Sequence, residues 1–221
     1  MIIGCTFVKA ATFLFPPGPG AAGYGMARRR DIPRDEILDA AQFLLQTRGC
    51  NGFSIRDLGE EVGLRTASLH YHFPAKADLL SAVVRRYRDR LNARIAEIEA
   101  ETDVLGARLE RVTALFSPLP GQGGRLCVLG VMAADFLTLP PGPAEEARAL
   151  TANLLGWLTR FISRAKAEGE LPPGTDPEAT AASLLAAIQG SLLLARTAGP
   201  EFTEGVMLAA LAGITTAEKH L

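Results

Sequence analysis

Cysteine is scarce in this 221-residue sequence, and the three that are present lie far apart. Cys5, Cys50 and Cys127 form no C-x-x-C pair. This spacing argues against a disulfide framework or a zinc site and favours a reducing cytoplasm as the location. We expect Cys50 to pack at a helix end and Cys127 to be a small buried hydrophobic residue. A redox-sensing thiol at Cys127 is the alternative.

Histidines are equally few, and no catalytic motif occurs. His70 and His72 stand two apart, so on a helix they point in different directions and cannot bind one metal together. The sequence lacks G-x-S-x-G, P-loop, H-E-x-x-H and EF-hand patterns. We therefore expect no enzyme activity, metal or cofactor. Asp135 stands alone in the apolar segment VMAADFL, where a helix-end or interface acid paired with an arginine is favoured over a ligand contact.

The β-branched residues Val and Ile number only 9 and 10, whereas Ala and Leu number 35 and 31. This imbalance favours helix over sheet. No apolar run reaches the length that spans a bilayer, so we expect no membrane association. The net charge of −1 hides an asymmetry, because residues 28–90 carry +3 and residues 91–221 carry −5. A basic lobe on an acidic body suits a DNA-binding head.

The segment from Phe53 to Leu80, FSIRDLGEEVGLRTASLHYHFPAKADLL, is the most informative part of the sequence. Ser54 can cap a short helix, and Gly63 stands where that helix must end with a positive φ. A second helix is predicted from Arg65 to His72, before Pro74. Two short helices joined by a glycine turn are typical of a helix-turn-helix, which places its second helix in the DNA major groove.

The residues of the second helix suit contact with DNA. Leu69 and Phe73 share one face and can pack on Leu58 and Val62 of the first helix. The remaining positions include no acid, and most can donate a hydrogen bond to a phosphate or a base edge. The alternative, an ordinary helical corner in a soluble bundle, is disfavoured by the whole run SLHYHF-PAK.

Residues 54–79 resemble the DNA-binding pattern of the TetR-type (TetR/AcrR) transcriptional regulators, T-x-x-x-I-A-x-x-A-G-V-x-x-x-x-L-Y-x-H-F-x-x-K-x-x-L. The resemblance is specific over residues 28–80. It implies that Arg65, Thr66 and Ala67 face the bases, and that Tyr71, His72 and Lys76 hold phosphates. The complete set of candidate DNA-contacting residues is Ser54, Arg65, Thr66, Ala67, Ser68, His70, Tyr71, His72 and Lys76.

Three positions depart from this family pattern. His70 stands where the family usually has Tyr, which leaves the contact at that position in doubt. Gly59 replaces the usual Ala, which weakens the first short helix by about 1 kcal/mol. Ala75 replaces a frequent capping Ser at the start of the next helix.

The predicted fold class is all-α, with an N-terminal three-helix helix-turn-helix domain and a C-terminal helical bundle for ligand binding and dimerisation. We assign residues 28–75 to the first domain and residues 76–221 to the second. Helices are expected at 34–48, from after Pro74 to about 100, and near 103–116, 125–138, 144–169, 177–198 and 202–218. The arginines of the long connecting helix are expected to form a solvated face: Arg85, Arg86, Arg88 and Arg90.

Residues 1–27 differ in composition from the rest of the chain, with an apolar run followed by PPGPGAAGYG. We expect a disordered extension, and Met26 is a candidate for the real initiator. The letters of a dinucleotide-binding motif at Gly18, Gly20 and Gly23 lack the strand and helix that such a motif needs. The following Arg28-Arg29-Arg30 is either a solvated tail or an arm that touches the DNA backbone or minor groove.

The last two predicted helices have small and apolar residues around much of their circumference. Ala182, Ala186 and Gly190 alternate with leucines, and a monomer would expose the resulting patch. Burial across a two-fold axis would cover it, and the TetR resemblance also implies a homodimer formed through these helices. The alternative is that the two helices are simply the core of a larger bundle.

The TetR resemblance further implies a pocket among the middle helices, with a ligand that changes the spacing of two DNA-binding heads. The candidate lining is mainly apolar, which suits a hydrophobic or aromatic effector. It consists of Tyr87, Leu115, Met132, Phe136, Trp157 and Phe161; the alternative is that all six are ordinary core. The sequence therefore predicts a ligand-responsive repressor that binds a double-stranded, pseudopalindromic operator. The alternative function is a helical interaction or small-molecule-binding module without operator binding.

Overall fold

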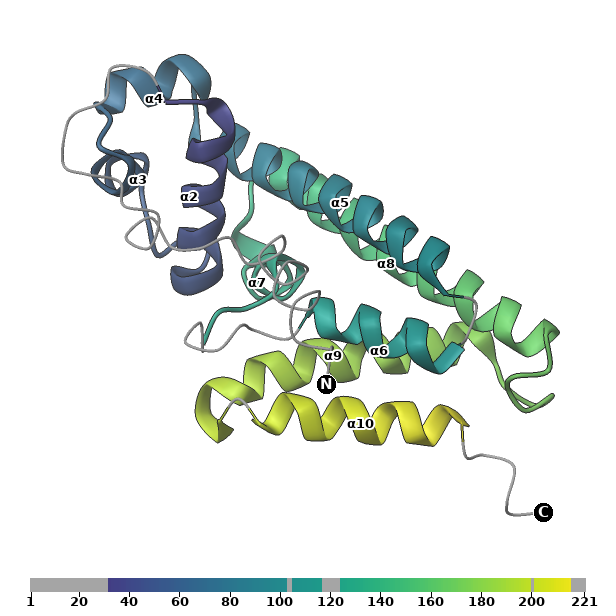
Figure 1. Ribbon diagram of the computed structural model, residues 1–221. Coiled ribbons are helices and arrows are strands. Elements are labelled where there is room, and N and C mark those ends of the chain that lie inside the picture. Colours follow the sequence, from purple (N-terminus) through teal and green to yellow (C-terminus); the bar gives the residue numbers. More distant parts are fainter. Residues whose placement is uncertain (1–31, 103–104, 117–123, 200, 216–221) are drawn as a thin grey trace.

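The computed structural model describes residues 32–102, 105–116, 124–199 and 201–215 (Figure 1). Within these ranges the regular structure is helical, which confirms the all-α prediction. The predicted N-terminal extension, the Met26 start and the arginine arm lie outside the described residues. The helices are α2 (Arg34–Arg48), α3 (Ile55–Val62), α4 (Thr66–His72), α5 (Lys76–Glu101), α6 (Leu105–Leu115), α7 (Val128–Ala134), the 3-10 turn η2 (Phe136–Thr138), α8 (Pro141–Ala167), α9 (Pro177–Ala198) and α10 (Glu201–Thr215).

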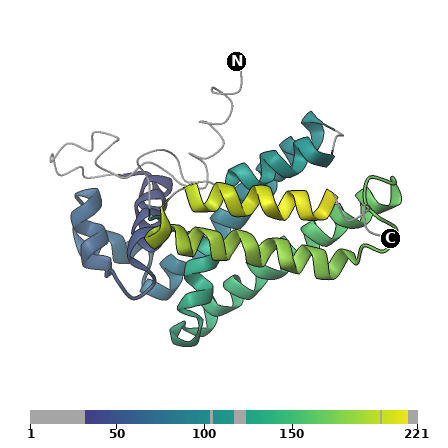
Figure 2. The same ribbon diagram turned by 90° about the horizontal axis from the view of Figure 1, so that it is seen from below.

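Helices α2, α3 and α4 form a small unit at one end of the molecule, which we call the head (Figure 1). Helix α5 leaves the head and runs along α8, whereas α9 and α10 lie together at the opposite edge (Figures 1 and 2). Helices α6 to α10 make up the body. The head and the body share one continuous buried cluster, so the connecting helix α5 is packed on both sides.

Helix α2 has the apolar stripe that its sequence predicts. Ile37, Leu38 and Leu44 are at most 1% exposed. The helix ends at Gly49, whose φ of 82° lies in the left-handed region that a residue without Cβ adopts at little cost. The chain then turns into the α2–α3 loop, residues 49–54, which meets both α5 and the body.

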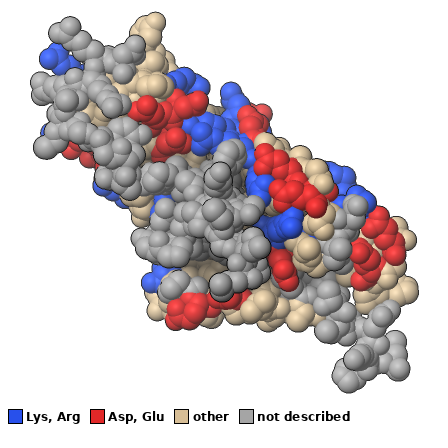
Figure 3. All heavy atoms as spheres, viewed as in Figure 1, with Lys and Arg blue, Asp and Glu red and all other residues tan. Residues whose placement is uncertain are grey.

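The arginines of α5 are only in part the solvated face that was predicted. The Arg85 side chain is 59% exposed, whereas those of Arg86, Arg88 and Arg90 are 11%, 23% and 25% exposed. Arg86 and Arg90 both reach Asp39 Oδ1 of α2, at 2.7 and 2.9 Å. Arg85 and Arg88 similarly hold Glu146 of α8, at 2.7 and 3.1 Å, and Figure 3 shows basic and acidic side chains side by side along this region. The sequence did not reveal the pairing because the partners lie 47 to 61 residues away.

Helix α8 begins at Pro141, three residues earlier than predicted. A helix that starts near residue 144 leaves the run LPPGP, residues 139–143, outside it. Proline is, however, well tolerated in the first helical turn, where its missing N–H has no partner to lose. Helix α9 has the predicted limits, because Asp176 accepts hydrogen bonds from the N–H groups of Glu178 and Ala179.

Helix α9 also corrects the expectation about membrane spans. Among the described helices it alone is long and apolar enough, by length and composition, to cross a membrane, although core helices of soluble proteins pass the same test. Its 18-residue window has a mean hydropathy of 1.4 and is 33% buried. The sequence interrupts the apolar run with Thr180, Ser183 and Gln189, so that no continuous stretch stands out. The abundant Ala and Leu nevertheless keep the average high.

Candidate DNA-contacting head and ligand groove

The first short helix of the head is capped as its sequence predicts. The Asp57 N–H donates to Ser54 Oγ at 3.2 Å, and the Ser54 N–H donates to Asp57 Oδ2 at 2.7 Å. These two bonds satisfy N–H groups that have no partner within the helix. The hydrogen bonds from Ser54 lower the pKa of the Asp57 carboxyl group. Ser54 therefore fixes where α3 begins.

The turn between α3 and α4 depends on two glycines. Gly63 ends α3 with a φ of 71°. Gly59 allows a close approach, because a Cβ there would lie 2.9 Å from the Leu64 carbonyl oxygen and 3.4 Å from Leu69 Cδ1. The glycine that weakens α3 by propensity thus allows the following turn to pack against it. This explains one departure from the family pattern.

Helix α4 is attached by one apolar face and leaves the other face open. Leu69 and Phe73 are 0% and 1% exposed, and both belong to the buried core that includes Leu58 and Val62. Tyr71 is 87% exposed. The other candidate contact residues of this helix and its cap are exposed or half-buried: Arg65, Thr66, Ala67, Ser68, His70 and His72. The predicted donors therefore lie on the accessible side of α4.

His70 has a local partner as well. Its Nδ1 lies 3.1 Å from the Pro74 carbonyl oxygen, just after the end of α4. The bond uses one ring nitrogen and leaves Nε2 for another contact. Ala75 cannot cap α5 with its side chain, but Asp78 Oδ2 accepts its N–H at 2.9 Å. Asp78 thus supplies one capping hydrogen bond at the start of α5, although the capping serine itself is missing.

Lys76 at the start of α5 has partners inside the head. Its ammonium group donates to the carbonyl oxygens of Cys50 and Phe53 in the α2–α3 loop. It also lies 4.5 Å from the centre of the Phe53 ring, and burial lowers its pKa. An ammonium group has three donor hydrogens, so these two bonds leave one. The phosphate contact expected of Lys76 stays a prediction, with an additional structural role beside it.

The α2–α3 loop is also held from the body. Asp135, which ends α7, accepts the Cys50 N–H on Oδ2 at 2.7 Å. Nearby, Cys50 Sγ lies 3.5 Å from Met132 Sδ, and Asn51 Nδ2 donates to Thr138 Oγ1 at 2.9 Å. Asp135 is therefore a helix-end acid at an interface, but its partner is a backbone N–H and not the arginine that was expected.

A second contact between body and head surrounds Gln46 on the last turn of α2. Its carbonyl oxygen accepts the Leu126 N–H at 3.0 Å and Arg196 Nη2 of α9 at 3.2 Å. Its side-chain Oε1 accepts Arg125 Nη2 at 2.7 Å. The Arg125 guanidinium also lies 5.0 Å from the centre of the Phe43 ring, and burial lowers its pKa to about 10. We call this group of residues the Gln46 clamp.

The six residues predicted to line a ligand pocket are packed into the core. Tyr87, Leu115 and Met132 are 0% exposed, and the Tyr87 hydroxyl lies 3.2 Å from Cys127 Sγ. Trp157 and Phe161 stack at 5.4 Å, and Trp157 Nε1 donates to Glu99 Oε1 at 2.9 Å. Phe136 lies half-buried beneath Arg148 in a cation–π contact of 4.8 Å.

An apolar groove lies elsewhere, between α7, α8 and α9. It has a volume of about 500 Å³ and is open on one side. The lining includes none of the six predicted residues; it consists of Leu126, Cys127, Leu129, Gly130, Ala133, Ala134, Thr151, Leu155, Ala182, Leu185, Ala186, Gln189, Gly190, Leu192 and Leu193. Sequence reasoning missed this groove because it depends on small residues of three helices that come together only in the fold.

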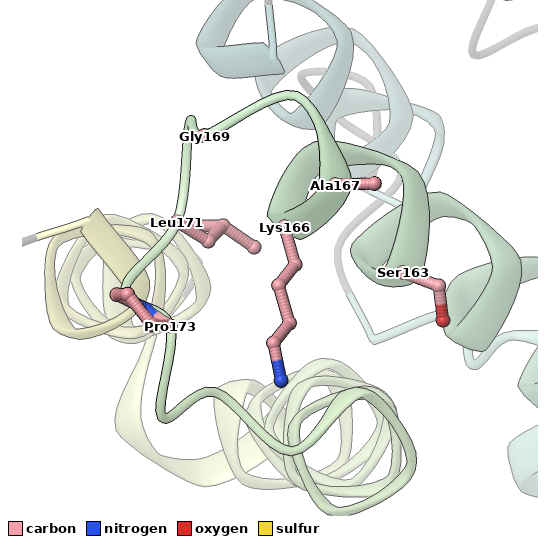
Figure 4. Close-up of a pocket in the computed structure, with 6 residues that line it drawn as sticks. All are labelled: Ser163, Lys166, Ala167, Gly169, Leu171 and Pro173. Carbon is pink, nitrogen blue, oxygen red and sulfur yellow. The ribbon is translucent and has the colours of Figure 1, made fainter.

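A second pocket, of about 450 Å³, lies where α8 turns toward α9 (Figure 4). Lys166 extends across it from the last turn of α8, and its Nζ donates to the Thr175 carbonyl oxygen at 2.7 Å. The lysine thereby supports the loop that leads to α9. The remaining lining consists of the buried Leu171 and the small residues Ser163, Ala167, Gly169 and Pro173. With its one cation already hydrogen-bonded, the pocket offers a ligand little that is specific.

The head, its exposed second helix and the grooved helical body define a helix-turn-helix DNA-binding transcriptional regulator. Residues 37–83 match the family described as bacterial regulatory proteins, tetR family. Residues 105–203 match the tetracyclin repressor-like C-terminal domain. The chain belongs to the TetR family, which confirms the resemblance, and regulators of this family are not enzymes.

Individual relatives agree with this assignment. A TetR-family transcriptional regulator of known structure from Agrobacterium tumefaciens is 32% identical, with a TM-score of 0.77 over 82% of this chain and 97% of its own. The HTH-type transcriptional repressor ComR of Escherichia coli is 28% identical over 177 residues, which are 76% of this chain and 82% of ComR. The nucleoid occlusion factor SlmA of Marinobacter nauticus is 27% identical over 157 residues, which are 71% of this chain and 78% of SlmA.

Proposed function

We propose that this protein is a cytoplasmic, homodimeric repressor that binds a pseudopalindromic operator and is released by a small effector. The observation that carries the proposal is the exposed side of α4. Its apolar residues are buried in the head, and its hydrogen-bond donors face solvent. Similar relatives are named transcriptional repressors, which supports the same sign of regulation.

Within this proposal, the residues of α4 divide by position. Arg65, Thr66 and Ala67 open the helix and face the bases, since the first residues of a recognition helix reach furthest into the major groove. Tyr71 and His72, in the last turn, contact phosphates. Ser54 at the start of α3, with Ser68, His70 and Lys76, completes the surface that follows the DNA backbone.

The dimer of this proposal forms through α9 and α10. Ala179, Ala182 and Ala186 are exposed on one face of α9, and the same face continues to Leu193, which is 52% exposed. Leu208 of α10 is 60% exposed. Figure 2 shows both helices side by side with no other described helix in front of them. Such a continuous apolar surface would remain wet in a monomer.

A second copy of the chain suits this surface better than a bilayer. Helix α9 packs on α8 with one side and on α10 with another, and Thr203 Oγ1 of α10 donates to the Ser191 carbonyl oxygen at 3.3 Å. Arg196, in the last turn of α9, donates a hydrogen bond to the Gln46 carbonyl oxygen of the head. A helix tied to the soluble head by these bonds is not free to enter a membrane.

Two substitutions test the dimer. No atom lies within 4 Å of where a Cβ of Gly190 would be, so one chain has space for the start of a larger side chain there. Gly190→Trp should therefore disturb the interface more than the monomer fold, by overpacking that costs about 1–3 kcal/mol. Leu208→Arg places a charge on the α10 side of the same surface, away from the groove.

Sedimentation should show monomers for both variants, while circular dichroism shows unchanged helix content. Two joined heads bind the two half-sites, about 34–36 Å apart or a multiple of that, as one unit. Loss of the second head should weaken operator binding by about 100-fold or more. Ser183→Ala is the exposed control on α9. Dimers with normal operator affinity in both variants would place the interface elsewhere.

The operator itself is found by sequencing the fragments that the protein selects from its own genome. Retardation of those fragments should fall steeply with salt, because phosphate contacts release counterions. Arg65→Ala should reduce the preference for the selected sequence over random DNA. A protein that retards no fragment at low salt would instead be the interaction module without operator binding.

A further inference from the structure

The groove between α7, α8 and α9 is almost entirely apolar. None of its lining residues is Lys, Arg, His, Asp or Glu, and none is aromatic. The hydroxyl of Thr151 donates to the Ala147 carbonyl oxygen at 3.0 Å, and Cys127 Sγ is already in contact with Tyr87. The volume of about 500 Å³ falls in the range of about 300–1,000 Å³ that is usual for small-molecule sites.

One polar group in this groove has no strong partner. Both the Oε1 and Nε2 atoms of Gln189 are buried, and neither makes a hydrogen bond of normal geometry among the described residues. The amide interacts with the Cys127 thiol, a weak partner that also contacts Tyr87. Leaving such an amide unpaired costs about 1–3 kcal/mol, so a protein keeps one where water or a ligand completes it. Gln189 lines the groove, so a ligand bound there would lie beside its amide.

The opposite wall of the groove makes space for this amide. A Cβ on Gly130 of α7 would lie 2.9 Å from Gln189 Oε1. Any larger residue at position 130 would push the amide away from its present place. The glycine thus has a specific consequence here: it lets a polar side chain of α9 reach the surface of α7.

We infer that the groove binds a mainly apolar, uncharged small molecule, whose single hydrogen-bonding group pairs with the Gln189 amide. This inference rests on the proposed effector response and specifies the class of effector. The amide offers both a donor and an acceptor, so a hydroxyl, ketone or amide group on the ligand would satisfy it. The leucines and alanines of the groove would cover the remainder of the ligand.

The absence of charge in the lining sets the second part of the specificity. An ionised head group that leaves water needs an opposite charge or several strong hydrogen bonds, and this groove provides one neutral amide. A quaternary ammonium group would also lack the aromatic rings that commonly hold it. Ligands of equal apolar length should therefore be ranked by charge, with the neutral one bound most tightly.

The groove and the proposed dimer surface share Ala182, Ala186, Gly190 and Leu193. A side chain of a second copy is therefore the competing occupant. Leucine or alanine from a partner would fill volume without satisfying Gln189, so the unpaired amide favours the small molecule. The two occupants differ in a measurable way, because a ligand would displace a partner that fills the groove.

Three ten-carbon probes test the inference: 1-decanol, decanoate and decyltrimethylammonium. Titration calorimetry on the full chain without DNA should give at least about tenfold tighter binding of 1-decanol than of either ion. Gln189→Leu keeps the size of the side chain but removes the amide, and should weaken 1-decanol binding by about three- to tenfold. Gly130→Ala should have the same effect, whereas Ser163→Ala in the pocket near Lys166 should have none.

The unfolding temperature provides a second measurement. Gln189→Leu should be at least as stable as the parent, because it removes an unpaired polar group from an apolar site. The inference is overturned if no probe binds, if an ion binds best, or if Gln189→Leu leaves the preference unchanged. It is also overturned if 1-decanol dissociates the dimer in sedimentation. Gel shifts with the selected operator fragments are measured separately, so failure of DNA binding would not be mistaken for failure of the groove.

Discussion

Replacement of Asp135 tests how firmly the body holds the head. Asp135 is the C-cap residue of α7, and its carboxylate Oδ2 lies 2.7 Å from the backbone N atom of Cys50. Cys50 is only 2% exposed, so water cannot easily replace the lost acceptor. Asp135→Ala removes the acceptor altogether, whereas Asp135→Asn keeps one neutral oxygen in nearly the same position.

The expected cost follows from the burial of the N–H group. A buried donor left without a partner loses about 1–3 kcal/mol, and bonds to a charged acceptor lie toward the upper end. We therefore expect Asp135→Ala to lower the free energy of unfolding by about 2 kcal/mol. In a chain of this size that corresponds to a fall of about 4–8 °C in Tm. Asp135→Asn should lose less than half as much.

The same substitution should change the chemistry of Cys50. Its thiol pKa is raised to about 12, first by burial and second by the negative charge of Asp135. Asp135→Asn removes the charge but not the burial, so the pKa should fall part of the way toward its ordinary value of 9.0. More of the thiol is then ionised at pH 9, and it should react faster with Ellman's reagent.

Thermal unfolding and thiol kinetics are measured on a Cys5→Ser background, which leaves the two buried thiols Cys50 and Cys127. Cys127→Ala then assigns the reacting group. If Asp135→Ala unfolds at the parent temperature and Cys50 keeps its reactivity, the bond between α7 and the α2–α3 loop contributes nothing. The reasoning about the head–body junction would then be wrong.

Three further results are expected. Lys76→Met should lower the free energy of unfolding by about 1–3 kcal/mol, because the ammonium group loses its two carbonyl contacts. Lys76→Ala should reduce the slope of operator affinity against salt by about one, because the remaining ammonium hydrogen is expected to bind a phosphate. A change in base preference with an unchanged slope would contradict the phosphate contact. The pKa of the Cys50 thiol is higher in the folded state, so the unfolded chain loses this proton first as the pH rises. The free energy of unfolding should therefore fall between about pH 9 and 12, and it should fall less in Cys50→Ala. Asp39→Asn removes the negative charge shared by Arg86 and Arg90. It should lower the free energy of unfolding, measured by thermal unfolding, by about 1–3 kcal/mol. Glu60→Gln, which breaks an exposed ion pair with Arg56, is the control.

Local signals in the sequence predicted the head well. Ser54 and Asp57 are three residues apart, and Gly63 follows one helix length later, so neighbours along the chain determine these features. The limits of α9 were predicted for the same reason, since Asp176 and Pro177 mark its start within two residues. Family membership also followed from the head, because its motif is contiguous.

The remaining features depend on residues that are distant in sequence. Lys76 finds its carbonyl partners 23 and 26 residues away, and Asp135 finds Cys50 85 residues away. The family resemblance suggested a pocket lined by large apolar residues such as Trp157, yet close packing buries these side chains, and the groove is lined by leucines together with alanines and glycines. Composition indicates how much apolar surface a chain has, but only the packed helices decide where it remains uncovered.

The Gln46 clamp has a consequence for protein engineering. A hybrid regulator would join the DNA-binding part of one protein to the sensing part of another. Here the carbonyl oxygen of Gln46 accepts from both Leu126 and Arg196, and its side chain accepts from Arg125. A hybrid that exchanges residues 32–75 alone must preserve these acceptor positions at the end of α2. The seam of a working chimera is therefore set by this turn of helix together with the contacts of Asp39 and of the α2–α3 loop, and not by the boundary between the two domains alone.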